Sequence, residues 1–174
     1  MPENSLLSVA PSPARSVEIV AVPHDDPRAA GLREVLDLDL DARYRGAEPE
    51  PPAVSAARAD ALRVHPDQLV ATLLAVTADG EALGHVMLRR LGDEWELKRL
   101  VVAPEARGAG VGRRLVQATI DLARTGGAAR VILQTGAAQP ESLALYRSFG
   151  FTPIPVYEPY VATMPTSLCF TLPL

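Results

Sequence analysis

Residues 100–115 read LVVAPEARGAGVGRRL, and this stretch decides the fold. An apolar segment typical of a buried strand runs through a short loop into three glycines, Gly108, Gly110 and Gly112, and then into an amphipathic helix. Glycine lets the backbone approach a ligand closely. The free amides of a helix's first turn point outward at the positive end of the helix dipole. The stretch therefore predicts an anion site suited to a phosphate or a pyrophosphate, with Arg107 and Arg113 adding charge-assisted hydrogen bonds.

Of two familiar phosphate-binding loops, one is excluded by the sequence and the other fits it poorly. A P-loop ends in Gly-Lys-Ser/Thr, whereas Gly112 is followed by Arg113 and Arg114. A dinucleotide-binding loop needs a third glycine where Arg113 stands, and it lies in a parallel strand–helix–strand unit. The strands before this loop are predicted to be antiparallel, so that interpretation fits poorly.

The segments around the loop alternate between strands and helices. The turn signals Asp79-Gly80 and Gly92-Asp93 separate apolar runs and predict antiparallel strands. Gly126-Gly127 ends the helix that follows the glycines. The predicted elements from here to the end of the chain are strands over 69–77, 82–91 and 95–102, a helix over 110–124, a strand over 130–134, a helix over 140–149, and strands over 151–155 and 167–172.

The N-terminal part is less regular. Residues 1–15 are rich in Pro and Ser and are expected to form a loose tail. A strand is predicted over 17–22. A helix over 27–40 follows, capped by Asp25 or Asp26 with Pro27 at its first position. The proline-containing stretch 41–53 is expected to be a long loop, and a second helix is predicted over 54–64.

Two motifs resemble the signatures of GNAT acetyltransferases. Arg107, Gly110 and Gly112 match the family's Arg/Gln-x-x-Gly-x-Gly/Ala loop. The segment 142–151, SLALYRSFGF, resembles its second signature, a helix ending in Leu-Tyr-x-x-x-Gly-Phe. The resemblance covers roughly residue 69 to the C-terminus. It implies a mixed α/β domain over 16–174 with a splayed, mostly antiparallel sheet of about six to seven strands and about four helices.

The resemblance also implies that the cofactor is acetyl-CoA and assigns residues to it. In the family the loop amides hold the coenzyme pyrophosphate, and the preceding strand contacts the pantetheine arm. The implied arm contacts are Leu100, Val101, Val102 and Gln139, where many family members have Asn. The implied pyrophosphate contacts are Arg107, Gly108, Ala109, Gly110, Val111, Gly112 and Arg113.

Acetyl transfer to an amine needs a proton donor for the departing thiolate, a hydrogen-bond donor for the thioester carbonyl, and a neutral amine. Tyr146 matches the family tyrosine that protonates the thiolate, although a core tyrosine is the alternative. The carbonyl donor is expected to be a backbone amide near Val101 or Val102. The strand becomes continuously apolar after Arg99, which favours a bulge there that would splay the neighbouring strand.

Glu96 is the candidate general base, because some GNAT enzymes use a glutamate on this strand. A surface cross-strand ion pair with Lys98 or another neighbour is an equally good interpretation, and ordered water could relay the proton instead.

The remaining chemistry-bearing residues carry structural interpretations. His24 and His65 are expected in loops. His85 lies on a central strand and is expected to be a structural histidine, although it could face the acceptor. Cys169 is expected to be buried packing. The two long loops contain Tyr44, Tyr157 and Tyr160, which could shape the acceptor site or simply anchor these loops.

Composition narrows the function classes. The net charge of −4 argues against nucleic acid or an anionic membrane as partner. A single cysteine permits no intrachain disulfide or thiolate metal cluster, which suits the cytoplasm. We expect a bacterial-type N-acetyltransferase that uses no metal, acts on a small-molecule amine and could form a homodimer. A protein-amine acetyltransferase and a CoA-binding regulatory domain without turnover are the alternatives.

Overall fold

The computed structural model describes residues 16–46 and 50–174, so the predicted tail and part of the predicted loop over 41–53 lie outside it. No helix in these ranges is long and apolar enough to cross a membrane. The helices are α1 (Pro27–Arg43), α2 (Pro52–Leu62), the short 3₁₀ helix η1 (Pro104–Ala106), α3 (Val111–Thr125) and α4 (Pro140–Ser148). The strands are β1 (Val17–Val22), β2 (Leu69–Thr77), β3 (Ala82–Leu91), β4 (Glu94–Val102), β5 (Arg130–Thr135), β6 (Thr152–Ile154) and β7 (Leu168–Pro173).

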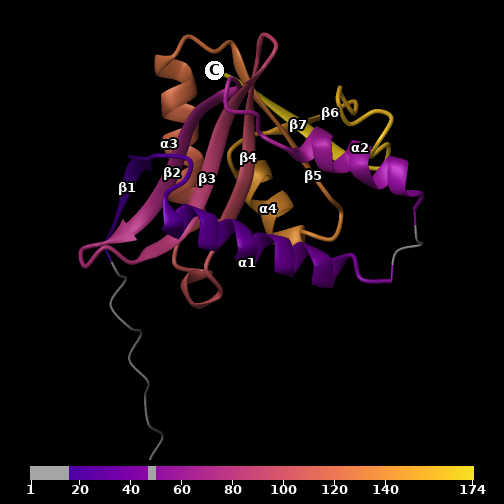
Figure 1. The fold of residues 1–174 in the computed structure, drawn as a ribbon. Coiled ribbons are helices and arrows are strands. Elements are labelled where there is room, and N and C mark those ends of the chain that lie inside the picture. The colour runs from indigo at the N-terminus through magenta and orange to yellow at the C-terminus, as the bar shows by residue number, and fades with distance from the viewer. Residues whose placement is uncertain (1–15, 47–49) are drawn as a thin grey trace, which may run out of the picture.

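The seven strands form one sheet in the order β1-β2-β3-β4-β5-β7-β6 (Figure 1). Every neighbouring pair is antiparallel except β4 and β5, which run parallel. The predicted mixed α/β fold with a mostly antiparallel sheet is therefore confirmed, as are the two hairpins that join β2 to β3 and β3 to β4.

Helix boundaries depart from the prediction near the N-terminal prolines. Asp26, one of the two predicted capping residues, caps α1 by accepting a hydrogen bond from the backbone amide of Arg28 at 2.9 Å. The helix then continues past Leu40 to Arg43, and α2 begins at Pro52 rather than at Val54. Proline is well tolerated in the first helical turn, where its missing amide needs no partner. The predicted loop is therefore shorter at both ends.

Helices cover both faces of the sheet. A Cβ atom on Gly84 of β3 would lie 2.8 Å from Leu115 and 2.9 Å from Val111, so α3 packs directly on this face. The next residue, His85, points to the opposite face because side chains alternate along a strand. Helix α1 contacts β3 and β4 and lies over that second face (Figure 1), where the charge of Arg33 acts on His85. The apolar core is built on both sides by residues such as Leu36 and Leu115.

Candidate active site

The start of α3 presents backbone amides without partners. Gly108 and Gly110 adopt φ angles of 79° and 80°, a left-handed conformation that other residues rarely adopt. The first backbone hydrogen bond into the helix runs from Arg114 to the carbonyl of Gly110 at 3.1 Å. Among the described residues, nothing accepts from the amides of Val111, Gly112 and Arg113, and no side chain caps the helix. These donors have the arrangement that the predicted anion site requires, and the binding of an anion there stays a prediction.

Two arginines flank these amides and are held by neighbouring groups. Arg107 donates to the carbonyl of Val102 at 3.3 Å and lies 3.6 Å from the carboxylate of Asp39 on α1. Arg113 donates to the Ser148 hydroxyl at 2.7 Å, and its guanidinium lies 4.8 Å from the centre of the Phe149 ring. Both side chains are therefore positioned before any anion arrives.

The strands β4 and β5 part beside this helix start. Their parallel pairing covers only Trp95 to Leu97 on β4. Beyond it, the register between β3 and β4 shifts, because His85 pairs with Val101 whereas Met87 pairs with Lys98. The bulge predicted after Arg99 is thus confirmed in position, and Arg99 itself has a φ of 55°. Within residues 16–46 and 50–174, the β5-facing edge of β4 has no strand partner from Lys98 to Val102.

The free strand edge and the free amides share one cleft of about 450 Å³. All but one of the predicted cofactor contacts line it, the exception being Ala109. The predicted contacts that line the cleft are Leu100, Val101, Val102, Arg107, Gly108, Gly110, Val111, Gly112, Arg113 and Gln139. An arm with amide groups and an anionic end would fit these walls, because the strand edge offers backbone partners and the helix start offers donors.

The cleft also has walls that the sequence did not predict. The last turns of α1 contribute Leu36, Asp39 and Arg43, and α4 contributes Glu141, Ser142 and Leu145. Arg43 joins the two helices, since it lies 3.1 Å from Asp39 and 2.5 Å from Glu141 and donates to the carbonyl of Ala138 at 2.8 Å. In the sequence, Asp39 and Arg43 have the spacing of an ordinary surface ion pair, so no signal there marks them as cleft residues.

Tyr146, the predicted proton donor, is buried in α4 with its ring edge-on to Phe151 at 5.8 Å between centroids. It directly follows the cleft residue Leu145 but does not line the cleft itself. Burial raises the pKa of Tyr146 above its ordinary value, so the phenol stays protonated at neutral pH. This arrangement is compatible with a proton donor and with a core tyrosine, and the catalytic role stays a prediction.

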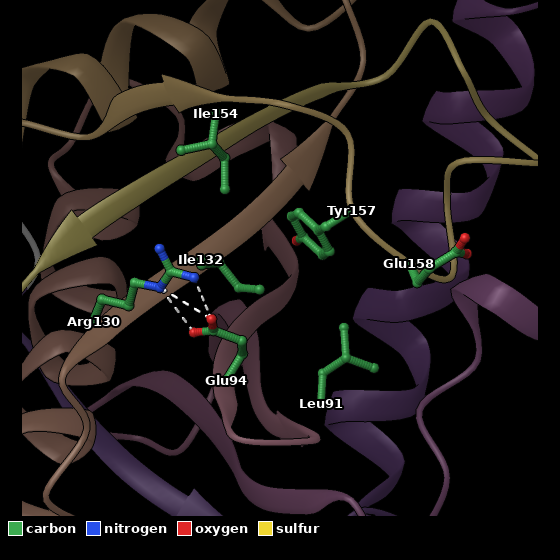
Figure 2. Close-up of a pocket in the computed structure, with 7 residues that line it drawn as sticks. All are labelled: Leu91, Glu94, Arg130, Ile132, Ile154, Tyr157 and Glu158. Atoms are coloured by element: carbon green, nitrogen blue, oxygen red, sulfur yellow. Dashed lines mark hydrogen bonds and ion pairs between the residues drawn. The ribbon is translucent and has the colours of Figure 1, made fainter.

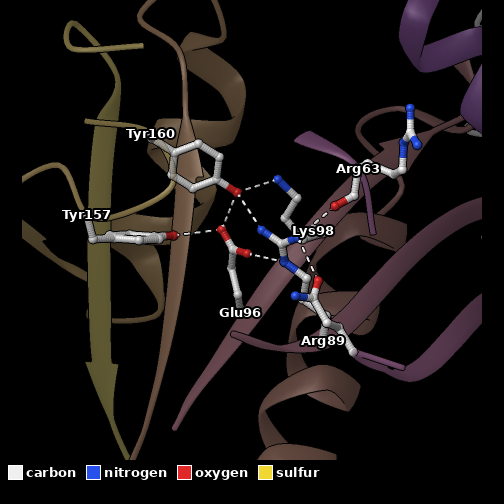
Figure 3. Close-up of polar contacts among 7 residues, drawn as sticks. Arg63, Arg89, Glu96, Lys98, Tyr157 and Tyr160 are labelled. Carbon is white, nitrogen blue, oxygen red and sulfur yellow. Dashed lines mark hydrogen bonds and ion pairs between the residues drawn. The ribbon is translucent and has the colours of Figure 1, made fainter. Parts of the chain in front are cut away.

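Glu96, the predicted base, lies in a polar cluster (Figure 3). The cluster consists of the buried side chains Arg89, Glu96, Lys98 and Tyr160 and the half-buried Tyr157. One carboxylate oxygen accepts from Arg89 at 2.5 Å. The other accepts from the hydroxyls of Tyr157 at 2.8 Å and Tyr160 at 2.7 Å. Glu96 is fully buried and does not line the cleft. The geometry favours the ion-pair interpretation, but the partner is Arg89 and the pair is buried.

The register of the β3–β4 hairpin could have identified this partner. A two-residue turn at Gly92-Asp93 places Arg89 directly opposite Glu96, as observed. Lys98 follows on the same face and donates to the Tyr160 hydroxyl at 2.6 Å. Burial lowers the pKa of Lys98 to about 8, opposed in part by the charge of Glu96.

The other singled-out side chains are mostly structural. His85 is buried beneath α1, with Nδ1 3.2 Å from the carbonyl of Leu73. Burial and the charge of Arg33 lower the pKa of His85 to about 4, so its ring is neutral at pH 7. Its Nε2 has no partner among the described residues. Cys169 is buried in β7, as predicted.

A second, smaller cavity of about 120 Å³ lies where β4 and β5 begin (Figure 2). Its most polar feature is the ion pair between Arg130 and Glu94, in which the guanidinium Nε lies 3.0 and 3.1 Å from the two carboxylate oxygens. This pairing lowers the pKa of Glu94. Tyr157 borders both this cavity and the polar cluster, but no predicted cofactor contact lies here.

Known proteins resemble this chain in sequence and in fold. The sequence profile of the Acetyltransferase (GNAT) family matches residues 32–151. An IAA acetyltransferase from Azospirillum brasilense is 38% identical over 52% of this chain and 59% of its own length. A [ribosomal protein bS18]-alanine N-acetyltransferase from Salmonella typhimurium is 30% identical over 52% of this chain and 61% of its own. The chain thus spans about three fifths of each of these relatives.

The fold itself is matched over a longer stretch. An acyl-CoA N-acyltransferase from Klebsiella pneumoniae superposes with a TM-score of 0.71, covering 91% of this chain and 97% of that protein. Sequence identity in this superposition is 23%, so the match concerns the fold. The match extends to most of the chain outside the family profile.

Proposed function

This chain belongs to the GNAT acetyltransferase family, and we propose that it transfers an acetyl group from acetyl-CoA to a primary amine of a small molecule. One observation carries the proposal: the partnerless amides of α3 and the free edge of β4 line a single cleft. Acetyl-CoA supplies a thioester, which is already activated toward attack by an amine. The remaining requirements fall to residues of this chain and to ordered water.

The cofactor is held mainly by backbone groups. The amides of Val111, Gly112 and Arg113 donate to the pyrophosphate, and Arg107 and Arg113 add positive charge. The unpaired edge of Leu100 to Val102 offers hydrogen bonds to the amide groups of the pantetheine arm, as one strand does to another. Gln139, which directly precedes α4 and lines the cleft, is placed to add a side-chain amide contact.

The chemical step needs two assigned protein groups. A backbone amide at Val101 or Val102 donates to the carbonyl oxygen as negative charge develops there. The amine nitrogen bonds to the carbonyl carbon, the carbon–sulfur bond breaks, and the Tyr146 hydroxyl gives its proton to the departing sulfur. The acceptor nitrogen loses its proton through ordered water. No protein residue is acylated in this scheme.

The chemical class of the acceptor amine is the part of the proposed reaction that the structure constrains least. Tyr160 is fully buried, so the loop between β6 and β7 folds back onto β4 and favours a small acceptor over a long peptide. The net charge of −4 favours a cationic amine. A protein amine is the second candidate, because one relative is named for a ribosomal protein.

A turnover assay with four amines tests the proposal. Spermidine, 2-phenylethylamine, free lysine and a hexapeptide beginning with Ala are each offered with acetyl-CoA, and release of the coenzyme thiol is measured. We expect amine-dependent release with at least one of the three small amines. Fastest release with the peptide would favour the protein-amine alternative. Tight acetyl-CoA binding without any amine-dependent release would favour a regulatory domain and contradict the proposal.

A further inference from the structure

The polar cluster joins segments that are distant in sequence. The Tyr160 hydroxyl donates its single proton to Glu96 and accepts from Lys98 at 2.6 Å and from Arg89 at 3.0 Å. A hydroxyl has one donor and two acceptor positions, so all of its hydrogen-bonding capacity is used. Tyr157 contributes a second hydroxyl, and the two tyrosine rings meet edge-on at 5.3 Å. Both come from the loop between β6 and β7.

Arg89 also binds a second connecting segment, the one between α2 and β2. Besides Glu96 and Tyr160, Arg89 donates to the carbonyl of Arg63 at 2.7 Å and to the Gln68 side chain at 3.2 Å. These two residues lie between α2 and β2. One buried guanidinium therefore ties two connecting segments to the centre of the sheet (Figure 3).

The cluster lies beside the point where β4 and β5 part. Lys98 is the first residue of β4 beyond the pairing with β5, and Leu100 to Val102 then line the cleft. The neighbouring Trp95 points the other way, toward the end of α3. Its ring lies so close to Gly126, which directly follows α3, that a Cβ atom there would clash with it. The cluster therefore lies on the side of the sheet opposite α3. On that side it holds the loop between β6 and β7 next to the point where β4 and β5 separate.

The Glu96 carboxylate is poorly placed to take a proton from an acceptor. It is fully buried, does not line the cleft, and already accepts hydrogen bonds from Arg89 and from the hydroxyls of Tyr157 and Tyr160. The contacts instead suit a carboxylate whose task is to hold two tyrosines in place.

We propose that the polar cluster is a lock that fixes the loop between β6 and β7 on β4, and that Glu96 is a positioning residue for the acceptor. The inference rests on the proposed function only for its kinetic consequence. The thioester would lie where β4 and β5 separate, and the loop between β6 and β7 borders this point. The position of the loop therefore sets the affinity for the acceptor. Acetyl-CoA binding depends on the cleft walls and is independent of the lock.

Hydrogen–deuterium exchange tests the lock without any substrate. The variant Tyr160→Phe removes the hydroxyl that links Glu96, Lys98 and Arg89 but keeps the ring. We expect exchange in residues 155–167 to rise by about tenfold or more, while residues 103–113 are unchanged. Tyr44→Phe is the matched control, because no hydrogen bond to its hydroxyl exists among the described residues, and it should leave the loop as in wild type. Unchanged loop exchange in folded Tyr160→Phe would overturn the lock.

Tyr157→Phe extends the test if Tyr160→Phe does not fold. It removes one loop hydrogen bond and leaves the link among Glu96, Lys98 and Arg89 intact. A smaller rise in exchange over the same residues is expected, and no rise would again contradict the lock.

Kinetics of Glu96→Gln separate positioning from proton transfer, using whichever of the four amines wild type acetylates fastest. A positioning role predicts an acceptor KM raised by about tenfold, with kcat and the acetyl-CoA Kd nearly unchanged. A general base predicts a kcat lowered by about 100-fold or more and loss of the acidic limb of the pH profile, and that result would overturn the inference. No turnover by wild type would contradict the proposed function, whereas deuterium exchange would still decide the lock.

Discussion

The cleft and the polar cluster meet on the same strand, yet they are built in opposite ways. The cleft presents backbone donors without partners at the start of α3 and along one edge of β4. The cluster is made of side chains whose hydrogen-bonding groups serve one another. Unsatisfied donors at an open surface are available to a ligand, whereas buried groups that pair with one another hold structure. The difference teaches that a charged residue beside a cleft need not act on the ligand.

The largest expected effect comes from removing the cluster's arginine. Arg89→Leu leaves the Glu96 carboxylate buried without its charge partner. Loss of one member of a buried pair costs about 3–5 kcal/mol of unfolding free energy. Urea unfolding measures this value, and Arg90→Leu, which changes the neighbouring exposed arginine, is the control. A loss below about 1 kcal/mol would show that water reaches the cluster and screens its charges.

The next largest effect is expected on turnover, when the hydroxyl of Tyr146 is removed. Tyr146→Phe keeps the buried ring and its contact with Phe151. If the hydroxyl protonates the departing thiolate, kcat should fall by about 100-fold while the acetyl-CoA Kd and the unfolding free energy stay near wild type. Steady-state kinetics and calorimetry measure both quantities. An unchanged kcat, in a step limited by chemistry, would assign Tyr146 to the core alone.

The pH dependence of stability sharpens the description of the cluster. The pKa of Lys98 is about 8 in the folded chain, against 10.5 for an unperturbed lysine. Between these values the unfolded state binds more protons than the folded state, so the unfolding free energy rises with pH. We expect a rise of about 1–2 kcal/mol from pH 8 to 9.5 that Lys98→Met lacks. An equal rise in both proteins would contradict the burial of this amine.

The smallest expected effect concerns a cleft side chain. Arg113→Ala removes one positive charge beside the free amides and should weaken acetyl-CoA binding by about tenfold at low salt, and by less at high salt. Arg124→Ala, an exposed arginine near the other end of the same helix, is the control and should leave binding unchanged. Equal weakening by both variants would indicate a diffuse field rather than a local contact.

Most of the fold could be predicted because its signals are local. The hairpin turns at Asp79-Gly80 and Gly92-Asp93 set the antiparallel strands, and the glycines before α3 mark its start. The change from alternating to continuous apolar residues after Arg99 locates the bulge. Each of these features depends on residues that are adjacent along the chain.

The parts that the sequence does not predict depend on contacts across long sequence distances. The end of α1 lines the cleft because Arg43 reaches Glu141 on α4. Tyr157 and Tyr160 meet Glu96 because a loop without helical or strand periodicity folds back onto β4. Nothing local in the sequence specifies such a path, so the hairpin register can reveal Arg89 as a partner of Glu96 but not the two tyrosines.

The central claim is that acetyl-CoA binds at the start of α3, and calorimetry of acetyl-CoA tests it most directly. The double variant Gly110→Asp/Gly112→Asp places two carboxylates beside the free amides, with a left-handed φ to accommodate at residue 110 and a Cβ atom 3.3 Å from Leu145 at residue 112. An acidic residue at a helix start is otherwise favourable for the helix. Gly80→Asp is the control, since Gly80 has a φ of 87° and open space like Gly110. We predict that wild type and Gly80→Asp bind, and that the double variant loses at least about 100-fold in affinity. Equal binding by all three folded proteins, or no binding by wild type, would contradict the claim.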